Sequence, residues 1–148
     1  LHVLGWQRAC VRWLGGWRER EGVAPWVLLN LAGALVLLGR GREAEAVSAF
    51  ALTLGADHTA PAHRAHAAWQ RAMGGDVEGA VAAVAPLAGG DVYVRGFRAL
   101  VHALDAAARP EGAPELSSHL AEANVAGGEE SVIEAAHRAT VDRIAGRA

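Results

Sequence analysis

Apolar residues recur at intervals of three and four along most of the chain, which is the spacing of one face of an α-helix. The clearest stripe lies between residues 25 and 38 and consists of Leu28, Leu31, Ala32, Leu35 and Leu38. Pro25 stands where a helix begins, because its missing N–H costs nothing there. Gly39 suits the left-handed position that ends a helix. We therefore predict a buried helix over residues 25–38.

Similar segments follow, separated by glycines and prolines that end helices. We expect helices near residues 43–54, 60–73, 76–87, 92–104 and 115–124. Gly127 and Gly128 then lead into a last helix that carries Glu129 and Glu130 in its first turn. No segment alternates with a period of two, so no strand is expected. The pattern predicts an all-α fold of about six to seven helices.

Near the N-terminus a stripe rich in tryptophan occupies one helical face. Its members are Trp6, Cys10, Trp13, Leu14 and Trp17. A tryptophan stripe can form a ligand box, but on an amphipathic helix it more often packs into the core. We expect these indoles to be buried.

Comparison of the chain with itself reveals a repeated unit. Leu4-Gly5 recurs 34 positions later as Leu38-Gly39, and the next matching turn is Gly75, 36 positions further on. A helix pair of this length cannot bury its apolar face alone, so copies must stack side by side.

These residues resemble the tetratricopeptide repeat family. The matching motif residues are Leu31, Ala32, Leu35, Gly39, Ala44, Ala51 and Leu54, and the resemblance extends over about residues 4–90. It implies a right-handed solenoid of helical hairpins. Departures from the family pattern are Ser48, Ala56 and Arg71, and Sel1-type or other helical-hairpin repeats remain open.

The resemblance divides the chain into one solenoid with five parts. These are a partial repeat over 1–22, a full repeat over 25–58, a second repeat over 59–90, a degenerate repeat over 91–126 and a capping helix over 127–148. Gly5 falls at a mid-repeat turn, so we expect this chain to be the C-terminal part of a longer solenoid.

In the family, the first helix of each pair lines a concave groove that binds peptides. On this chain the implied groove residues are Trp26, Leu29, Asn30, Gly33, Leu37, His66, Trp69 and Met73. An amide at Asn30 can donate and accept toward a peptide backbone, although it can equally bond a neighbouring helix. Arg95 and Arg98 could recognise an anionic end of the ligand, or could simply be solvated.

Charge and composition bear on which classes of partner the protein can bind. The formal charge is -2 and all 14 basic residues are arginine, so there is no electrostatic signature of nucleic-acid binding. The single cysteine, Cys10, excludes an internal disulfide. The uncharged run between Glu21 and Arg40 is at the short end for a membrane span and contains Pro25 and Asn30, which argues against a membrane location. The cytoplasm is favoured.

Candidate chemistry is sparse. His58, His63 and His66 invite a metal hypothesis, but zinc needs three or four converging ligands and no recognised motif accompanies these residues. No glycine-rich piece continues into a phosphate-binding GK[ST] sequence. We expect no metal, no cofactor and no catalytic residue.

The leading hypothesis is therefore an interaction scaffold that binds a peptide or partner domain in the concave groove. One alternative is a regulatory or oligomerising C-terminal tail of a larger enzyme or signalling protein. A third is a metal-dependent hydrolase that uses the three histidines.

Overall fold

The computed structural model describes residues 5–55, 58–87 and 89–146. Within these ranges the chain forms eight α-helices and no strand, which confirms the all-α prediction and exceeds the expected six to seven helices by one. The helices are α1 (Gln7–Trp13), α2 (Pro25–Leu37), α3 (Gly41–Thr53), α4 (Ala60–Met73), α5 (Val77–Val84), α6 (Val92–Ala108), α7 (Ala113–Glu129) and α8 (Ser131–Ile144). A short 3₁₀ helix, η2 (Trp17–Glu19), follows α1.

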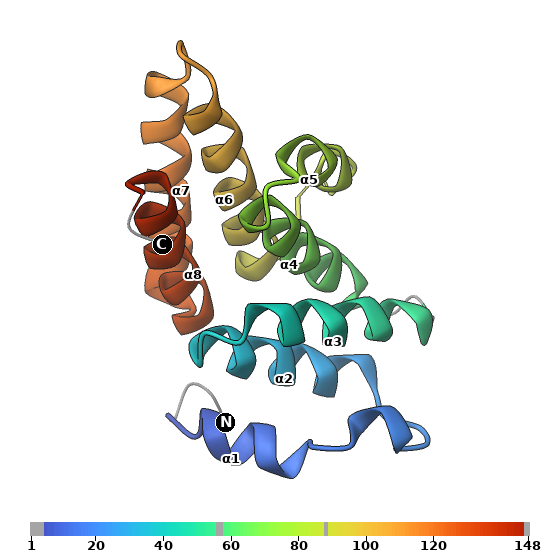
Figure 1. Cartoon of the computed structure of the whole chain (residues 1–148). Coiled ribbons are helices and arrows are strands. Elements are labelled where there is room, and N and C mark those ends of the chain that lie inside the picture. The colour runs from blue at the N-terminus through green and yellow to red at the C-terminus, as the bar shows by residue number, and fades with distance from the viewer. Residues whose placement is uncertain (1–4, 56–57, 88, 147–148) are drawn as a thin grey trace.

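Consecutive helices pack side by side in pairs. Helices α1, α2 and α3 lie across the lower part of Figure 1, while α6, α7 and α8 stand nearly upright in its upper part. Helix α4 joins the two groups, because it packs on α3 as well as on α5 and α6. The observed arrangement is that of stacked helix pairs without a sheet.

The turns that end α2 and α4 share one hydrogen-bond pattern. At the first, the N–H of Gly39 donates to the carbonyl of Val36 (2.9 Å) and that of Arg40 to Leu35 (2.8 Å). At the second, Gly75 donates to Ala72 and Asp76 to Arg71, each at 3.0 Å. Both glycines have positive φ, 70° and 105°, as this Schellman turn requires. The two turns matched in sequence are therefore also matched in structure.

Helix α8 does more than follow α7. It packs on α6 and α7 and also reaches back to α2, far away in sequence (Figure 1). The indole N–H of Trp69, on α4, donates to the hydroxyl of Thr140, on α8, at 2.9 Å. Gly96 on α6 lets α8 approach, since an added Cβ would lie 2.6 Å from Cγ2 of Ile133. Helix α8 thus contacts α2, α6 and α7 and bonds α4 through Trp69.

The buried residues form two clusters. One joins α1, α2 and α3 around Leu28, Leu31, Leu35 and Val47. The other extends from α4 to α8 and has Phe97 near its centre. The chain therefore has a smaller N-terminal core and a larger C-terminal core.

The prediction that Gly127 and Gly128 separate two helices was wrong. Helix α7 continues through both glycines to Glu129, and Glu130 caps α8 by accepting from the N–H of Val132. Gly127 is buried, and a Cβ there would lie 3.1 Å from the Cα of Glu134. Here glycine permits close approach of two helices instead of ending one.

The prediction of a buried tryptophan stripe was wrong for two of its members. Trp6 is 58% exposed and Trp13 is 66% exposed, whereas Cys10 and Leu14 on the same short helix are buried. Helix α1 has seven residues and packs chiefly on α2. One neighbouring helix covers only a narrow stripe, so the two indoles remain in solvent.

Among the helices described, none is long and apolar enough to cross a bilayer. The uncharged run that raised the question forms α2, which has 13 residues.

Candidate functional site

The structure distributes the ten expected binding residues over three environments. Gly33, His66 and Trp69 are buried, and Leu29, Asn30, Leu37, Met73 and Arg98 are half-buried. Only Trp26 and Arg95 are exposed. Leu29, Leu37 and Met73 pack against the C-terminal cluster. Trp69 bonds Thr140 on α8, whereas His66 bonds Ser48 on α3 and packs on Phe97 of α6, so neither side chain is open to a partner.

The two expected arginines lie apart from Trp26. Arg98 donates to the backbone carbonyl of Leu87 at 2.8 Å, which ties it to the end of the α5 segment. Arg95 lines a shallow hollow with Glu122 and Val125, between α6 and α7. The structure therefore does not bring these arginines together with the α2 residues in one groove.

Two buried histidines connect α3 and α4 through a serine. Ser48 Oγ lies 2.9 Å from Nδ1 of His66 and 3.3 Å from Nδ1 of His63. Nε2 of His63 lies 3.0 Å from the carbonyl oxygen of Pro25, and Nε2 of His66 lies 3.4 Å from the amide nitrogen of Gln70. All three of the residues Ser48, His63 and His66 are at most 1% exposed.

The donor and acceptor properties of these groups determine the direction of each hydrogen bond between Pro25 and Gln70. With both rings neutral, His63 carries its proton on Nε2, because a carbonyl oxygen only accepts, and its Nδ1 accepts from the Ser48 hydroxyl. The Ser48 oxygen in turn accepts from Nδ1–H of His66, and Nε2 of His66 accepts from Gln70. Burial, and to a lesser extent His63, lowers the pKa of His66 to about 3.

This histidine pair links α2, α3 and α4 through its hydrogen bonds. No group of three or more His, Cys, Asp or Glu side chains in the described ranges is placed to hold a metal ion. His58 is exposed at the surface, whereas His63 and His66 are enclosed between helices. Burial raises the pKa of the Cys10 thiol and so disfavours the thiolate. These residues hold α3 against α4.

An accessible apolar hollow lies between α1 and α2. We call it the tryptophan slot; it is lined by Cys10, Trp13, Leu14, Trp26, Val27 and Asn30 and has a volume of about 210 Å³. Trp26 is 54% exposed and Trp13 is 66% exposed, so the slot opens between two indoles in solvent. The Asn30 amide donates to the backbone carbonyl of Trp26 at 3.0 Å, within its own helix.

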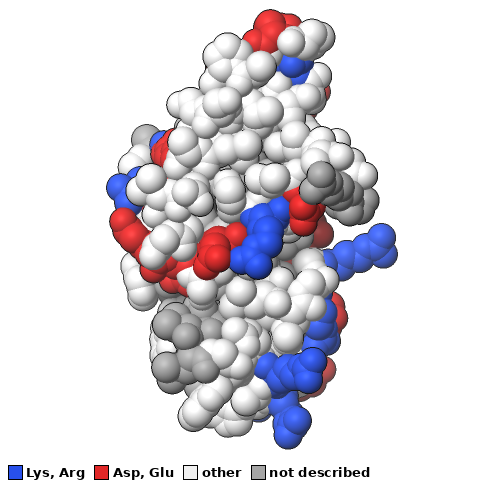
Figure 2. Space-filling view, turned by 90° about the vertical axis from the view of Figure 1, so that its left-hand side faces the viewer, with Lys and Arg blue, Asp and Glu red and all other residues white. Residues whose placement is uncertain are grey.

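The surface around this end of the molecule is positively charged. Figure 2 shows blue side chains over the lowest part of the molecule, where α1 lies. Residues 5–24 carry four exposed arginines, at positions 8, 12, 18 and 20, and two exposed glutamates, at positions 19 and 21. Arg20 donates to the carbonyl of Trp13 at 2.6 Å and so lies beside the slot.

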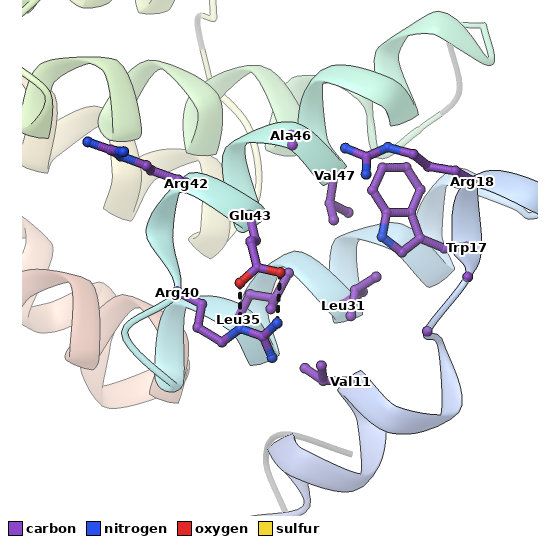
Figure 3. Close-up of a pocket in the computed structure, with 12 residues that line it drawn as sticks. Val11, Trp17, Arg18, Leu31, Leu35, Arg40, Arg42, Glu43, Ala46 and Val47 are labelled. Atoms are coloured by element: carbon purple, nitrogen blue, oxygen red, sulfur yellow. Dashed lines mark hydrogen bonds and ion pairs between the residues drawn. The ribbon is translucent and has the colours of Figure 1, made fainter.

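A second cavity opens between η2 and α3. We call it the Trp17 cavity; its volume is about 270 Å³, and it is lined by Val11, Gly15, Gly16, Trp17, Arg18, Leu31, Leu35, Arg40, Arg42, Glu43, Ala46 and Val47. Figure 3 shows the Trp17 ring on one side and the Arg40–Glu43 pair on the other. Both nitrogens of the Arg40 fork bond the Glu43 carboxylate, at 2.6 and 2.7 Å.

Sequence reasoning pointed to Trp26 and Asn30 but missed Trp13, Trp17 and Arg18. Trp13 was assigned to the core with the rest of its stripe. A signal for the Trp17 cavity was present in Gly15-Gly16, since two residues without side chains leave space beside an aromatic ring. That signal is weak, because glycine pairs also end helices.

Comparison with known proteins identifies no relative. No family model, no curated protein and no solved structure matches this chain.

Proposed function

We propose that this protein is an interaction scaffold of the tetratricopeptide type, and that it binds its partner at the tryptophan slot. The stacked helix pairs and the two equivalent turns at Gly39 and Gly75 support the repeat assignment. The observation that carries the binding assignment is the pair of exposed indoles, Trp13 and Trp26, on either side of an apolar hollow.

Two exposed tryptophans on either side of one hollow are typical of a binding surface. Tryptophan and arginine are enriched among residues that dominate interface energies, and they act best beside a pocket that accepts an apolar anchor. The slot offers space for one large apolar side chain, and the guanidinium of Arg20, bonded to the carbonyl of Trp13, places a positive charge beside it. We therefore propose a partner segment with a large apolar residue flanked by aspartate or glutamate.

The test is selection from a random peptide display library on the wild-type protein. We expect the selected peptides to share an apolar anchor between acidic residues. Replacement of Trp13 and Trp26 by alanine should weaken their binding by about 1–2 kcal/mol per indole, that is about five- to thirty-fold each. Fluorescence anisotropy with labelled peptides measures the effect.

Trp6→Ala is the matched control, because Trp6 is also an exposed tryptophan near α1 but does not line the slot. It should leave the affinity unchanged. Equal losses for Trp6→Ala and Trp13→Ala would contradict the assignment of the slot. A wild-type dimer that the Trp13 and Trp26 changes convert to a monomer in sedimentation would show that the slot binds a second copy instead.

A further inference from the structure

We propose that the Trp17 cavity is a separate binding site for a carboxylate attached to a small apolar or aromatic group. The proposal goes beyond the partner surface described above, since the two hollows share no lining residue.

The interior of the cavity fits an apolar group. Val11, Leu31, Leu35 and Val47 supply aliphatic walls, and Leu31, Leu35 and Val47 are at most 3% exposed. Trp17 closes one side, and Phe50 holds it in an edge-to-face contact with ring centroids 4.9 Å apart. The volume of about 270 Å³ is near the lower limit of ligand pockets, so the occupant must be small.

The mouth of the cavity favours a negative charge. Arg18 lies over the Trp17 ring, with its guanidinium carbon 4.4 Å from the ring centroid, and Figure 3 shows that guanidinium directed toward α3. Within the described ranges Arg18 forms no ion pair with a carboxylate. Stacking on the indole therefore fixes the guanidinium in place and leaves its donors available.

The opposite rim shows what kind of group the site accepts. Arg40 holds Glu43 in a two-point ion pair there, which is the geometry that a guanidinium forms with any carboxylate. The lining contains three arginines and this one glutamate, so a cation would meet net repulsion. Arg42 extends away from Trp17 and adds only long-range attraction (Figure 3).

The backbone at the rim leaves room for a ligand to enter the cavity. Gly15 and Gly16 form part of the rim without side chains, and Gly16 has φ of 69°, which side-chain-bearing residues rarely adopt. A ligand can therefore enter beside Trp17 with its apolar end toward Leu31 and its carboxylate toward Arg18.

The experiment compares 3-phenylpropionate with 3-phenylpropionamide by ligand-observed NMR titration. The two probes have the same shape and differ in charge. We expect the acid to bind in about the millimolar range and the amide about tenfold more weakly. A parallel titration of a short peptide that ends in phenylalanine, as free acid and as amide, distinguishes a free metabolite from a chain terminus as the source of the carboxylate.

Three variants locate the site. Arg18→Gln should reduce acid binding about five- to tenfold and Arg18→Lys should restore part of it, whereas Arg64→Gln on α4 removes an exposed arginine elsewhere and should have no effect. The double change of Trp13 and Trp26 to alanine should also have no effect on acid binding. The proposal for the Trp17 cavity is therefore tested independently of the proposal for the tryptophan slot. Equal binding of acid and amide, no binding of either, or indifference to Arg18→Gln would overturn it.

Discussion

Tryptophans of the two core regions have opposite surroundings. Trp69, in the C-terminal region, is 3% exposed, touches Phe97 and bonds Thr140. Trp13 and Trp26, in the N-terminal region, are more than half exposed. All lie on helices with apolar stripes, so the stripe alone does not decide burial. What differs is the number of neighbouring elements: α4 packs on α3, α5 and α6 and bonds α8 through Trp69, while α1 packs chiefly on α2.

This difference explains why one region is a core and the other a surface for recognition. A side chain surrounded on all sides contributes its full transfer free energy to folding. A side chain covered on one side retains apolar area that a partner can still bury. Three experiments would sharpen or break this comparison.

Trp69→Ala should have the largest effect. It leaves a cavity and removes the bond to Thr140, so we expect the free energy of unfolding to fall by about 3–5 kcal/mol. Trp13→Ala, the same change at an exposed position, should alter it by less than about 0.5 kcal/mol. Urea denaturation followed by circular dichroism measures both. Similar losses for the two variants would show that α1 is buried in solution.

Acid should destabilise the protein through His66. Its pKa is lowered from 6.5 to about 3 in the folded state, so the unfolded chain binds the proton more tightly. The stabilising contribution is complete above pH 6.5 and is lost as pH falls from 6.5 toward 3, at up to about 1.4 kcal/mol per pH unit. Between pH 6.5 and 5 the loss should be about 1.6 kcal/mol.

Urea midpoints at several pH values give this slope. His66→Gln should flatten the slope while His58→Gln, at an exposed position, should not. If both variants retain the wild-type slope, the acid sensitivity resides in other groups.

Two glycines provide the smallest and most closely matched test. Gly96→Ala places a methyl group 2.6 Å from Ile133 Cγ2 and should destabilise the fold by about 1–3 kcal/mol. Gly128→Ala meets no atom within 4 Å and should stabilise α7 by about 0.5–1 kcal/mol. Thermal unfolding separates the two by sign. Stabilisation by both changes would indicate that α6 and α8 are less closely packed than the structure shows.

Helix positions were largely predictable from the chain. Pro25, Gly39 and Gly75 act locally, within a turn of the residues they influence, so their effect can be read without knowing the fold. The failures were at Gly127 and in the tryptophan stripe. In both, the outcome depended on a second helix: α8 approaches Gly127, and no further helix in the described ranges covers Trp13.

The candidate sites were predictable only in part. Trp26 and Asn30 were expected at a binding surface through the family resemblance, and both line the tryptophan slot. The Trp17 cavity joins α1, η2, α2 and α3, and no spacing in the sequence indicates that Arg18 and Arg40 face the same space. Convergence of distant residues depends on helix packing, which single-sequence periodicity does not describe.

By itself the sequence determined the all-α class, most helix limits and the repeated turn, because these follow from backbone preferences and hydrophobic spacing over a few residues. Only the tertiary structure decided that α8 returns to α2 and covers Trp69, and that Trp13 and Trp26 stay in solvent. The physical reason is that a side chain is buried only when a second surface packs against it. The apolar stripe identifies the face of a helix that is able to pack, and the tertiary structure decides whether another helix lies against that face.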